Sequence, residues 1–153
     1  MKKRYKRIKN LSWGLFIIYL AGMAYFLFFS EQLRRSGADN YRYNLEAFQE
    51  IKRAWYCFQT GNMQYFFLNV VMNVAAFAPF GFFLPIISTR HKKFISVFLL
   101  SLELTLAIES LQLFFKVGIF DVDDIIMNTL GGVIGYLVYY IVRNMERKRN
   151  HGR

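Results

Sequence analysis

The sequence is poor in the residues that build disulfide frameworks and soft metal centres. Cys57 is the single cysteine among 153 residues, so the chain forms no internal disulfide and no cysteine-based metal site. Its two histidines, His91 and His151, fall in a loop and near the C-terminus, which argues against a histidine-ligated zinc site. Internal repeats, low-complexity tracts and long linkers are also lacking. We therefore expect one domain over residues 1–153 and no cofactor.

Apolar and aromatic side chains are what the sequence has in excess. Hydrophobic residues make up 55% of the chain, which contains 17 Phe and 10 Tyr. Residues 11–29 carry no charge, and as a helix this run is about 28 Å long, enough to cross a bilayer. No Ala-x-Ala cleavage signal follows it closely, so we expect an anchor that stays in the mature protein.

Three further apolar runs, at residues 63–88, 94–115 and 125–142, predict three more membrane spans. The expected fold class is therefore an all-α membrane protein, a bundle of four transmembrane helices. In the fourth span, Gly131 and Gly135 have the small-xxx-small spacing that lets two membrane helices approach closely.

The net charge of +10 is concentrated at the expected membrane edges. Basic residues gather before the first span, between the second and third spans, and after the fourth span (Lys2, Lys3, Arg4, Lys6, Arg7, Lys9; Arg90, Lys92, Lys93; Arg143, Arg147, Lys148, Arg149, Arg153). This is the positive-inside pattern, and it predicts a cytoplasmic-membrane protein with both termini in the cytoplasm. The segments 30–62 and 116–124 then lie outside. The pattern favours anionic lipid rather than nucleic acid as the partner of these basic ends.

An amphipathic helix is expected in the outer segment before the second span. From residue 44 to residue 59, apolar side chains recur at spacings of three and four, opposite charged and amide side chains. Asn44 stands at the position of an N-cap. Such a helix either lies in the outer membrane interface or packs over the mouth of the bundle. Both arrangements place it beside the acidic turn at residues 116–124.

Polar side chains recur at a similar depth in three of the expected spans. In the third span, Ser101, Thr105, Glu109 and Gln112 lie within about 80° of one another at 100° per residue and form one polar stripe. Glu103 falls on the opposite side of that helix. Facing stripes would enclose a small polar pocket that opens to the outside. Its expected lining is Asn69, Asn73, Glu109, Gln112, Asp121, Asp124 and Asn128.

A structural interpretation of the same residues also stays open. Asn and Gln in membrane spans often only bond neighbouring helices, at about 0.6 kcal/mol each, and for Asn69 this interpretation is the favoured one. Asp121 and Asp123 are compatible with a structural role, as solvated turn positions or a helix N-cap, and for Asp123 we favour such a role. Glu109 and Asp124 are a costly way to make a packing contact within a membrane, so for them we favour a functional role.

Three motifs of the chain resemble the VanZ-like family, whose namesake is associated with resistance to the glycopeptide teicoplanin. They are the segment from Asn73 to Gly81, Glu109-Ser-Leu-Gln112, and the turn from Asp121 to Gly132. Arg42, Asn44, Leu45 and Phe48 also resemble the family's Arg-x-x-Asn-Leu-x-x-Phe segment, although Ala47 stands where Pro is usual. The resemblance covers residues 42–140. Many members carry an Arg shortly before the first Asp of the turn, where this chain has Gly118-Ile119-Phe120 with Lys116 nearby.

Three functions follow from these observations. The resemblance implies the first, a membrane factor that lowers susceptibility to lipoglycopeptide antibiotics and acts at the outer leaflet on a lipid-linked cell-wall precursor or on the drug. The second is an enzyme that uses Glu109, Asp121 and Asp124 around Mg²⁺ to process a lipid-linked phosphate or pyrophosphate, since Mg²⁺ prefers oxygen ligands. No Arg or His stands in the turn to hold that phosphate. The third is a small channel or transporter with Glu109 as a proton or cation site, which would require oligomerisation.

Overall fold

The computed structural model describes residues 2–29, 41–88 and 90–151, and they form helices joined by short turns. The long helices are α1 (Lys2–Phe29), α4 (Met72–Ile87), α5 (Phe94–Phe114) and α6 (Val122–His151). Shorter elements precede α4, namely α2 (Gln49–Gln59), α3 (Met63–Phe66) and the π-helix η1 (Phe67–Val71). The two strands β1 (Tyr43–Asn44) and β2 (Phe120–Asp121) have two residues each. The all-α prediction is confirmed for these residues.

Three helical stretches of the described chain are long and apolar enough to cross a membrane: Met63–Ile87, Phe94–Phe114 and Val122–Arg149. They match the second, third and fourth predicted spans, although α6 begins earlier than residue 125 and extends well beyond residue 142. The second span combines α3, η1 and α4 into one continuous helix. The run at residues 11–29 is helical as part of α1, and its insertion as a fourth span stays a prediction.

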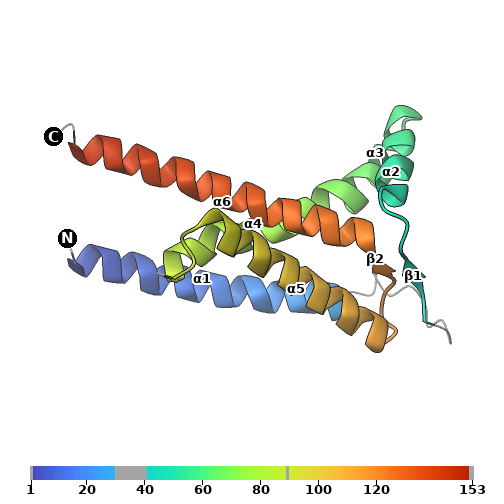
Figure 1. The fold of residues 1–153 in the computed structure, drawn as a ribbon, viewed down its shortest axis with the longest axis horizontal. Coiled ribbons are helices and arrows are strands. Elements are labelled where there is room, and N and C mark those ends of the chain that lie inside the picture. Colours follow the sequence, from blue (N-terminus) through green and yellow to red (C-terminus); the bar gives the residue numbers. More distant parts are fainter. Residues whose placement is uncertain (1, 30–40, 89, 152–153) are drawn as a thin grey trace.

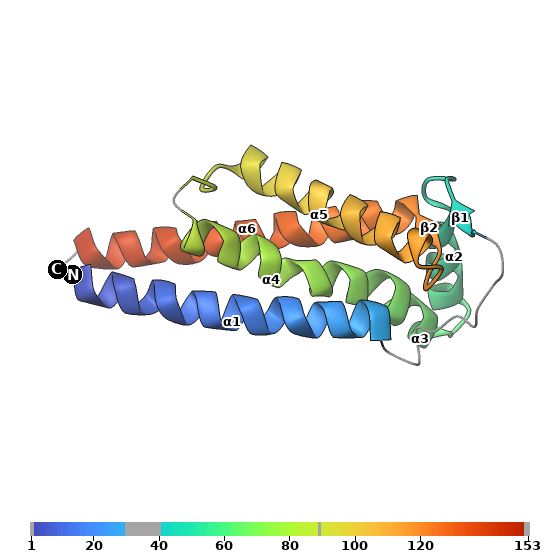
Figure 2. The same ribbon diagram turned by 90° about the horizontal axis from the view of Figure 1, so that it is seen from below.

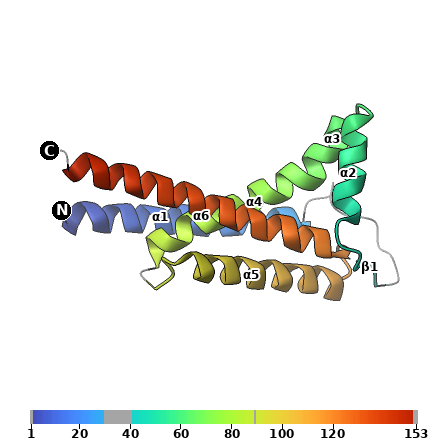
Figure 3. The same ribbon diagram turned by 45° about the horizontal axis from the view of Figure 1, so that its top comes forward.

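Both chain ends lie at the same end of the molecule, and β1, β2 and α2 lie at the other end (Figures 1 and 2). The connection from α4 to α5 is on the side of the termini. The basic segments of the sequence are thus gathered toward one end and the acidic turn lies at the opposite end. In Figure 3 the chain from α4 through α3 diverges from α6, and α2 bridges the gap back toward the start of α6.

Helix α6 packs against α4 with unusually little space between the two backbones. A Cβ atom added at Gly131 would lie 2.2 Å from the carbonyl oxygen of Val74, and one at Gly135 would lie 1.9 Å from that of Ala78. Gly81 of α4 approaches Gly132 in the same way, because a Cβ there would lie 1.8 Å from the Gly132 carbonyl oxygen. The close approach predicted from the glycine spacing is confirmed.

Helix α1 joins the bundle through an apolar cluster with α4 and α5. Phe16, Phe80 and Val97 are buried there, and the rings of Phe16 and Phe80 lie 5.9 Å apart. The Tyr19 hydroxyl donates a hydrogen bond to the carbonyl oxygen of Ala76 at 2.7 Å. Burial of an apolar side chain away from water stabilises a fold by about 1.5–3 kcal/mol. Surrounding lipid would reduce this gain, and the contacts of α1 with the bundle would then depend on packing.

The amphipathic helix before the second span is shorter than the sequence predicts. Helix α2 begins at Gln49, and the prediction of Asn44 as its N-cap is wrong, because Asn44 belongs to β1. Phe48 precedes α2 in a left-handed conformation, with φ 67°, which turns the chain sharply into the helix. At the other end of α2, Trp55 and Phe58 pack against each other and against Phe66 of α3.

Candidate functional site

A short parallel strand pair joins the segment before α2 to the turn before α6. Tyr43 is opposite Phe120 and Asn44 is opposite Asp121, and the backbone N–H of Phe120 donates to the carbonyl oxygen of Arg42 at 3.1 Å. The pairing brings residues that are more than seventy positions apart in sequence into direct contact. The acidic turn is therefore one structural unit with the segment that leads into α2.

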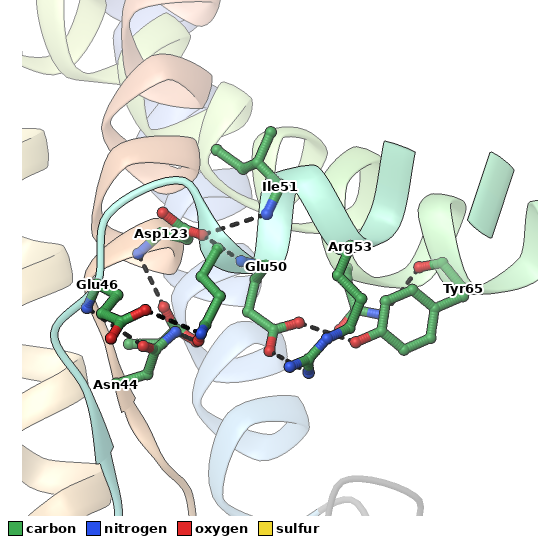
Figure 4. A network of polar contacts seen from close by, with 10 residues as sticks. Asn44, Glu46, Glu50, Ile51, Arg53, Tyr65 and Asp123 are labelled. Atoms are coloured by element: carbon green, nitrogen blue, oxygen red, sulfur yellow. Dashed lines mark hydrogen bonds and ion pairs between the residues drawn. The ribbon is translucent and has the colours of Figure 1, made fainter. Parts of the chain in front are cut away.

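Asp123 is the centre of this unit, as Figure 4 shows. Its side chain is fully buried, with 0% exposure. The carboxylate accepts hydrogen bonds from the backbone N–H groups of Phe48, Glu50 (2.6 Å) and Ile51 (3.2 Å). These are N–H groups at the start of α2, which have no partner within their own helix, so Asp123 caps a helix distant in sequence.

The structural role favoured for Asp123 fits this geometry: it caps a helix, and the helix is α2 rather than the one in which Asp123 lies. A solvated position is contradicted by its burial. The left-handed Phe48 explains the geometry, because it directs the N–H groups of the first turn of α2 toward α6. The site set predicted from the sequence omits Asp123 because a structural role is favoured for it, although no local sequence pattern indicates its partner in α2.

Asp121 links three segments of the chain. It is buried, with 8% exposure. Its carboxylate accepts from the Asn44 side chain at 3.2 Å and from the backbone N–H of Asp123 at 2.8 Å, while its own N–H donates to Glu109 Oε2 at 3.0 Å. Burial raises the pKa of Asp121 above its ordinary value, partly opposed by the hydrogen bonds from Asp123 and Asn44.

Glu109 lies on the predicted polar face of α5. Ser101, Thr105 and Glu109 are all buried, at 0%, 0% and 3% exposure, whereas Glu103 is exposed on the other side of the helix. The stripe and the exclusion of Glu103 from it are therefore confirmed. Gln112, at the end of the stripe nearest the turn, is partly exposed, and its side chain lies against Gly118.

Two polar contacts join α6 to its neighbours. Asn73 Nδ2 of α4 donates to Asp124 Oδ1 at 2.6 Å. Asn128 Nδ2 donates to the Thr105 hydroxyl of α5 at 3.0 Å. Polar groups from the three helices thus meet in two separate contacts, made by two residues one helical turn apart on the same face of α6.

Asn69 lies apart from these contacts. Its side chain donates to the carbonyl oxygen of Tyr65 in its own helix at 2.8 Å, within the π-helical part of the second span. Asn73 makes a similar bond, to the carbonyl oxygen of Asn69, in addition to its contact with Asp124. The structural interpretation of Asn69 therefore fits its geometry better than a role in lining a pocket.

A polar depression of about 470 Å³ opens on the surface beside the strand pair. Of the predicted site residues, Asp121 lines it; the other lining residues are Tyr41, Arg42, Tyr43, Asn44, Gln49, Glu50 and Ile119. The Lys116 ammonium lies 5.0 Å from the centre of the Tyr41 ring. The turn lacks the Arg that resembling sequences carry, but Arg42 stands in the lining of this depression.

The side chains around the acidic turn accept hydrogen bonds and can hold a polar group. Within the described residues, no three His, Cys, Asp or Glu side chains are grouped so that they could hold a metal ion. The carboxylates of Asp121 and Asp123 instead accept backbone N–H groups from neighbouring segments. The Mg²⁺-dependent enzyme considered from the sequence stays a hypothesis.

Comparison with known proteins yields one family and a distant relative. The family model VanZ/LLP1 matches residues 16–143. Protein VanZ of Enterococcus faecium is 31% identical over 145 residues, which cover 92% of this chain and 81% of that protein. No solved structure matches the chain.

Proposed function

This chain belongs to the VanZ/LLP1 family, and from that membership we propose that it lowers the susceptibility of a bacterial envelope to lipoglycopeptide antibiotics such as teicoplanin. It acts at the outer leaflet of the cytoplasmic membrane, on a lipid-linked cell-wall precursor or on the lipid tail of the drug. Family membership supports the proposed decrease in antibiotic susceptibility. The polar unit at the end of the bundle opposite the termini supports the place of action.

The proposal includes a topology of four spans, with α1 inserted beside the three apolar helices. The basic residues of both termini and of the connection between α4 and α5 face the cytoplasm. The strand pair, α2 and the start of α6 then face the outside, where a drug or a wall precursor is first encountered. The exposed aromatic side chains of Trp55 and Tyr56 on α2 suit a position at the membrane interface.

One observation supports the site more than any other. Glu109 is buried inside an apolar span, and it contacts the backbone of Asp121 at the edge of the outer polar depression. A carboxylate in such a position is costly, by about 2.5–3.5 kcal/mol on insertion scales, whereas an amide could accept the same backbone N–H. The acid is therefore a costly choice where an amide would make the same bond, which points to a use for its carboxyl group.

The test compares drug susceptibility of a susceptible bacterium that expresses the protein or its variants. Glu109→Gln keeps an oxygen that accepts the Asp121 N–H, and Asp124→Asn keeps an oxygen for Asn73. We expect both variants to lose protection against teicoplanin while their membrane expression and melting temperature are maintained. Glu103→Gln is the matched control, since it removes an exposed acid from the opposite face of α5 and should keep full protection.

If Glu109→Gln and Asp124→Asn both keep full protection against teicoplanin, the site assignment is wrong. Loss of expression in both would make these acids structural and would also contradict the proposal. If the unmodified chain confers no protection against any lipoglycopeptide, the proposed function itself is wrong.

A further inference from the structure

Helix α5 forms one edge of the bundle, and no other described element covers its outer face (Figures 2 and 3). Exposed side chains recur on this face at spacings of three and four and lie within about 100° of one another at 100° per residue. We call these residues the outer stripe of α5 (Ile95, Leu99, Glu103, Leu106, Ser110, Phe114). Apart from Glu103 and Ser110 they are large apolar side chains, with exposures from 39% at Leu106 to 70% at Phe114.

Glu103 lies at the centre of the outer stripe and near the middle of an apolar span. Helix α5 is long and apolar enough to cross a membrane. At 1.5 Å of rise per residue, Glu103 is about 14 Å from Phe94 and about 17 Å from Phe114, the two ends of α5. Its side chain is exposed, and no hydrogen bond or ion pair joins it to another described residue. The other acid of α5, Glu109, is buried and accepts the N–H of Asp121.

An exposed carboxyl group at this depth requires a polar partner. Ionisable side chains in membrane spans rarely face lipid, and they pair with another polar group of the protein or face water. Long Lys and Arg side chains can extend to the membrane interface, but a Glu side chain is too short to do so from the middle of a span. The described part of the chain places no partner beside Glu103, so the partner comes from another molecule at the same depth.

A second copy of this chain supplies that partner. Two copies inserted in the same direction are related by a two-fold axis along the membrane normal, so each residue near the axis meets its own equivalent at the same depth. A carboxyl group is suited to meet its equivalent, because the protonated form donates and the ionised form accepts, and the two can share one proton. A Lys or Arg side chain, which only donates, could not pair with itself in this way.

We propose that this chain forms a dimer through the outer stripe of α5, with the two Glu103 side chains hydrogen-bonded to each other at the two-fold axis. The apolar residues on either side of Glu103 pack against their equivalents and leave the lipid. The dimer goes beyond the proposed function and does not depend on antibiotic protection.

The first experiment tests whether two outer stripes lie together in native membranes, by disulfide crosslinking of the full chain on a Cys57→Ser background. Leu106→Cys places a thiol one helical turn from Glu103, and mild oxidation should give a covalent dimer. Leu130→Cys is the matched control, because Leu130 of α6 has a similar exposure (48% against 39%) and lies at a similar distance from the same end of the bundle. Its crosslinking should be about tenfold lower, since its thiols lie too far apart to form a bond.

The second experiment measures association of the purified full chain in liposomes, by energy transfer between copies labelled at Cys57 with a donor or an acceptor dye. Glu103→Leu should weaken dimerisation about tenfold, because it removes the hydrogen bond between the copies. The variant removes a costly group from a lipid-facing position, so it should fold and insert at least as well as the unmodified chain. Glu103→Gln should keep the dimer, since an amide also donates and accepts, and its use as a control for antibiotic protection is compatible with this.

Three results would overturn the proposal. The first is a chain that stays monomeric in liposomes at every ratio of protein to lipid. The second is equal crosslinking of Leu106→Cys and Leu130→Cys, or a crosslink from Leu106→Cys only to a different membrane protein, which would then be the partner of the outer stripe. The third is unchanged association in Glu103→Leu, which would show that Glu103 does not hold two copies together.

Discussion

Helix α6 is held in two different ways along its length. Its middle meets α4 through glycine, where backbone touches backbone and any side chain would collide. Its beginning meets α2 through the carboxylate of Asp123, which accepts hydrogen bonds from the backbone of that distant segment. The contact with α4 requires glycines, which have no side chain, and the contact with α2 requires a carboxylate. Different substitutions therefore break the two contacts.

The glycine contact should be the most sensitive to substitution. Gly135→Ala would place a methyl group 1.9 Å from the Ala78 carbonyl oxygen, so α4 and α6 must move apart. We expect a destabilisation of about 3 kcal/mol or more, measured by thermal or denaturant unfolding in detergent. Gly14→Ala in α1 meets nothing within 4 Å and should stabilise by about 0.5–1 kcal/mol. Equal effects of the two substitutions would contradict the glycine contact.

The carboxylate contact should respond to a change that keeps the shape and removes the charge. Asp123→Asn presents N–H donors where the backbone of α2 already donates, so we expect a loss of about 2 kcal/mol or more. Hydrogen exchange should then show faster exchange at the amides of Phe48, Glu50 and Ile51. Glu46→Gln, which changes an exposed acid nearby, should leave that protection within experimental error. Unchanged protection in Asp123→Asn would disprove the cap.

A smaller effect is expected between these two regions, where Asn73 meets Asp124. Membrane hydrogen bonds are worth about 0.6–2 kcal/mol, so a double-mutant cycle of Asn73→Leu with Asp124→Ala should give a coupling energy of about 1 kcal/mol. The same cycle with Asn69→Leu should show little coupling, since the Asn69 side chain bonds its own helix. Equal coupling for the two asparagines would remove the distinction between them.

The smallest effect concerns pH at Asp121. Its folded pKa is raised above the ordinary 3.8, so the folded state holds its proton more tightly than the unfolded chain. The stabilisation is complete below the ordinary pKa and is lost as pH rises from about 3.8 through the folded pKa. Unfolding of the protein and of Asp121→Asn should therefore differ in slope across this interval, with the flatter profile in Asp121→Asn. Parallel profiles would contradict the shift.

The sequence by itself determined the features that depend on local composition and helical period. It predicted helices over four apolar runs, the glycine contact of α6, and the buried face of α5 with Glu103 outside it. These follow from 1.5 Å of rise and 100° of rotation per residue, which place side chains on a helix surface before any partner is known.

Tertiary structure alone decided which segments meet at the acidic end. Asp123 and its three backbone partners are separated by more than seventy residues, and no spacing rule reaches that far. For the same reason, the local sequence could not indicate that Asn44 pairs with Asp121 in a strand instead of capping a helix. The free N–H groups at the start of a helix donate to whichever acceptor the fold brings close. The identity of that acceptor is therefore fixed by packing and not by the local sequence.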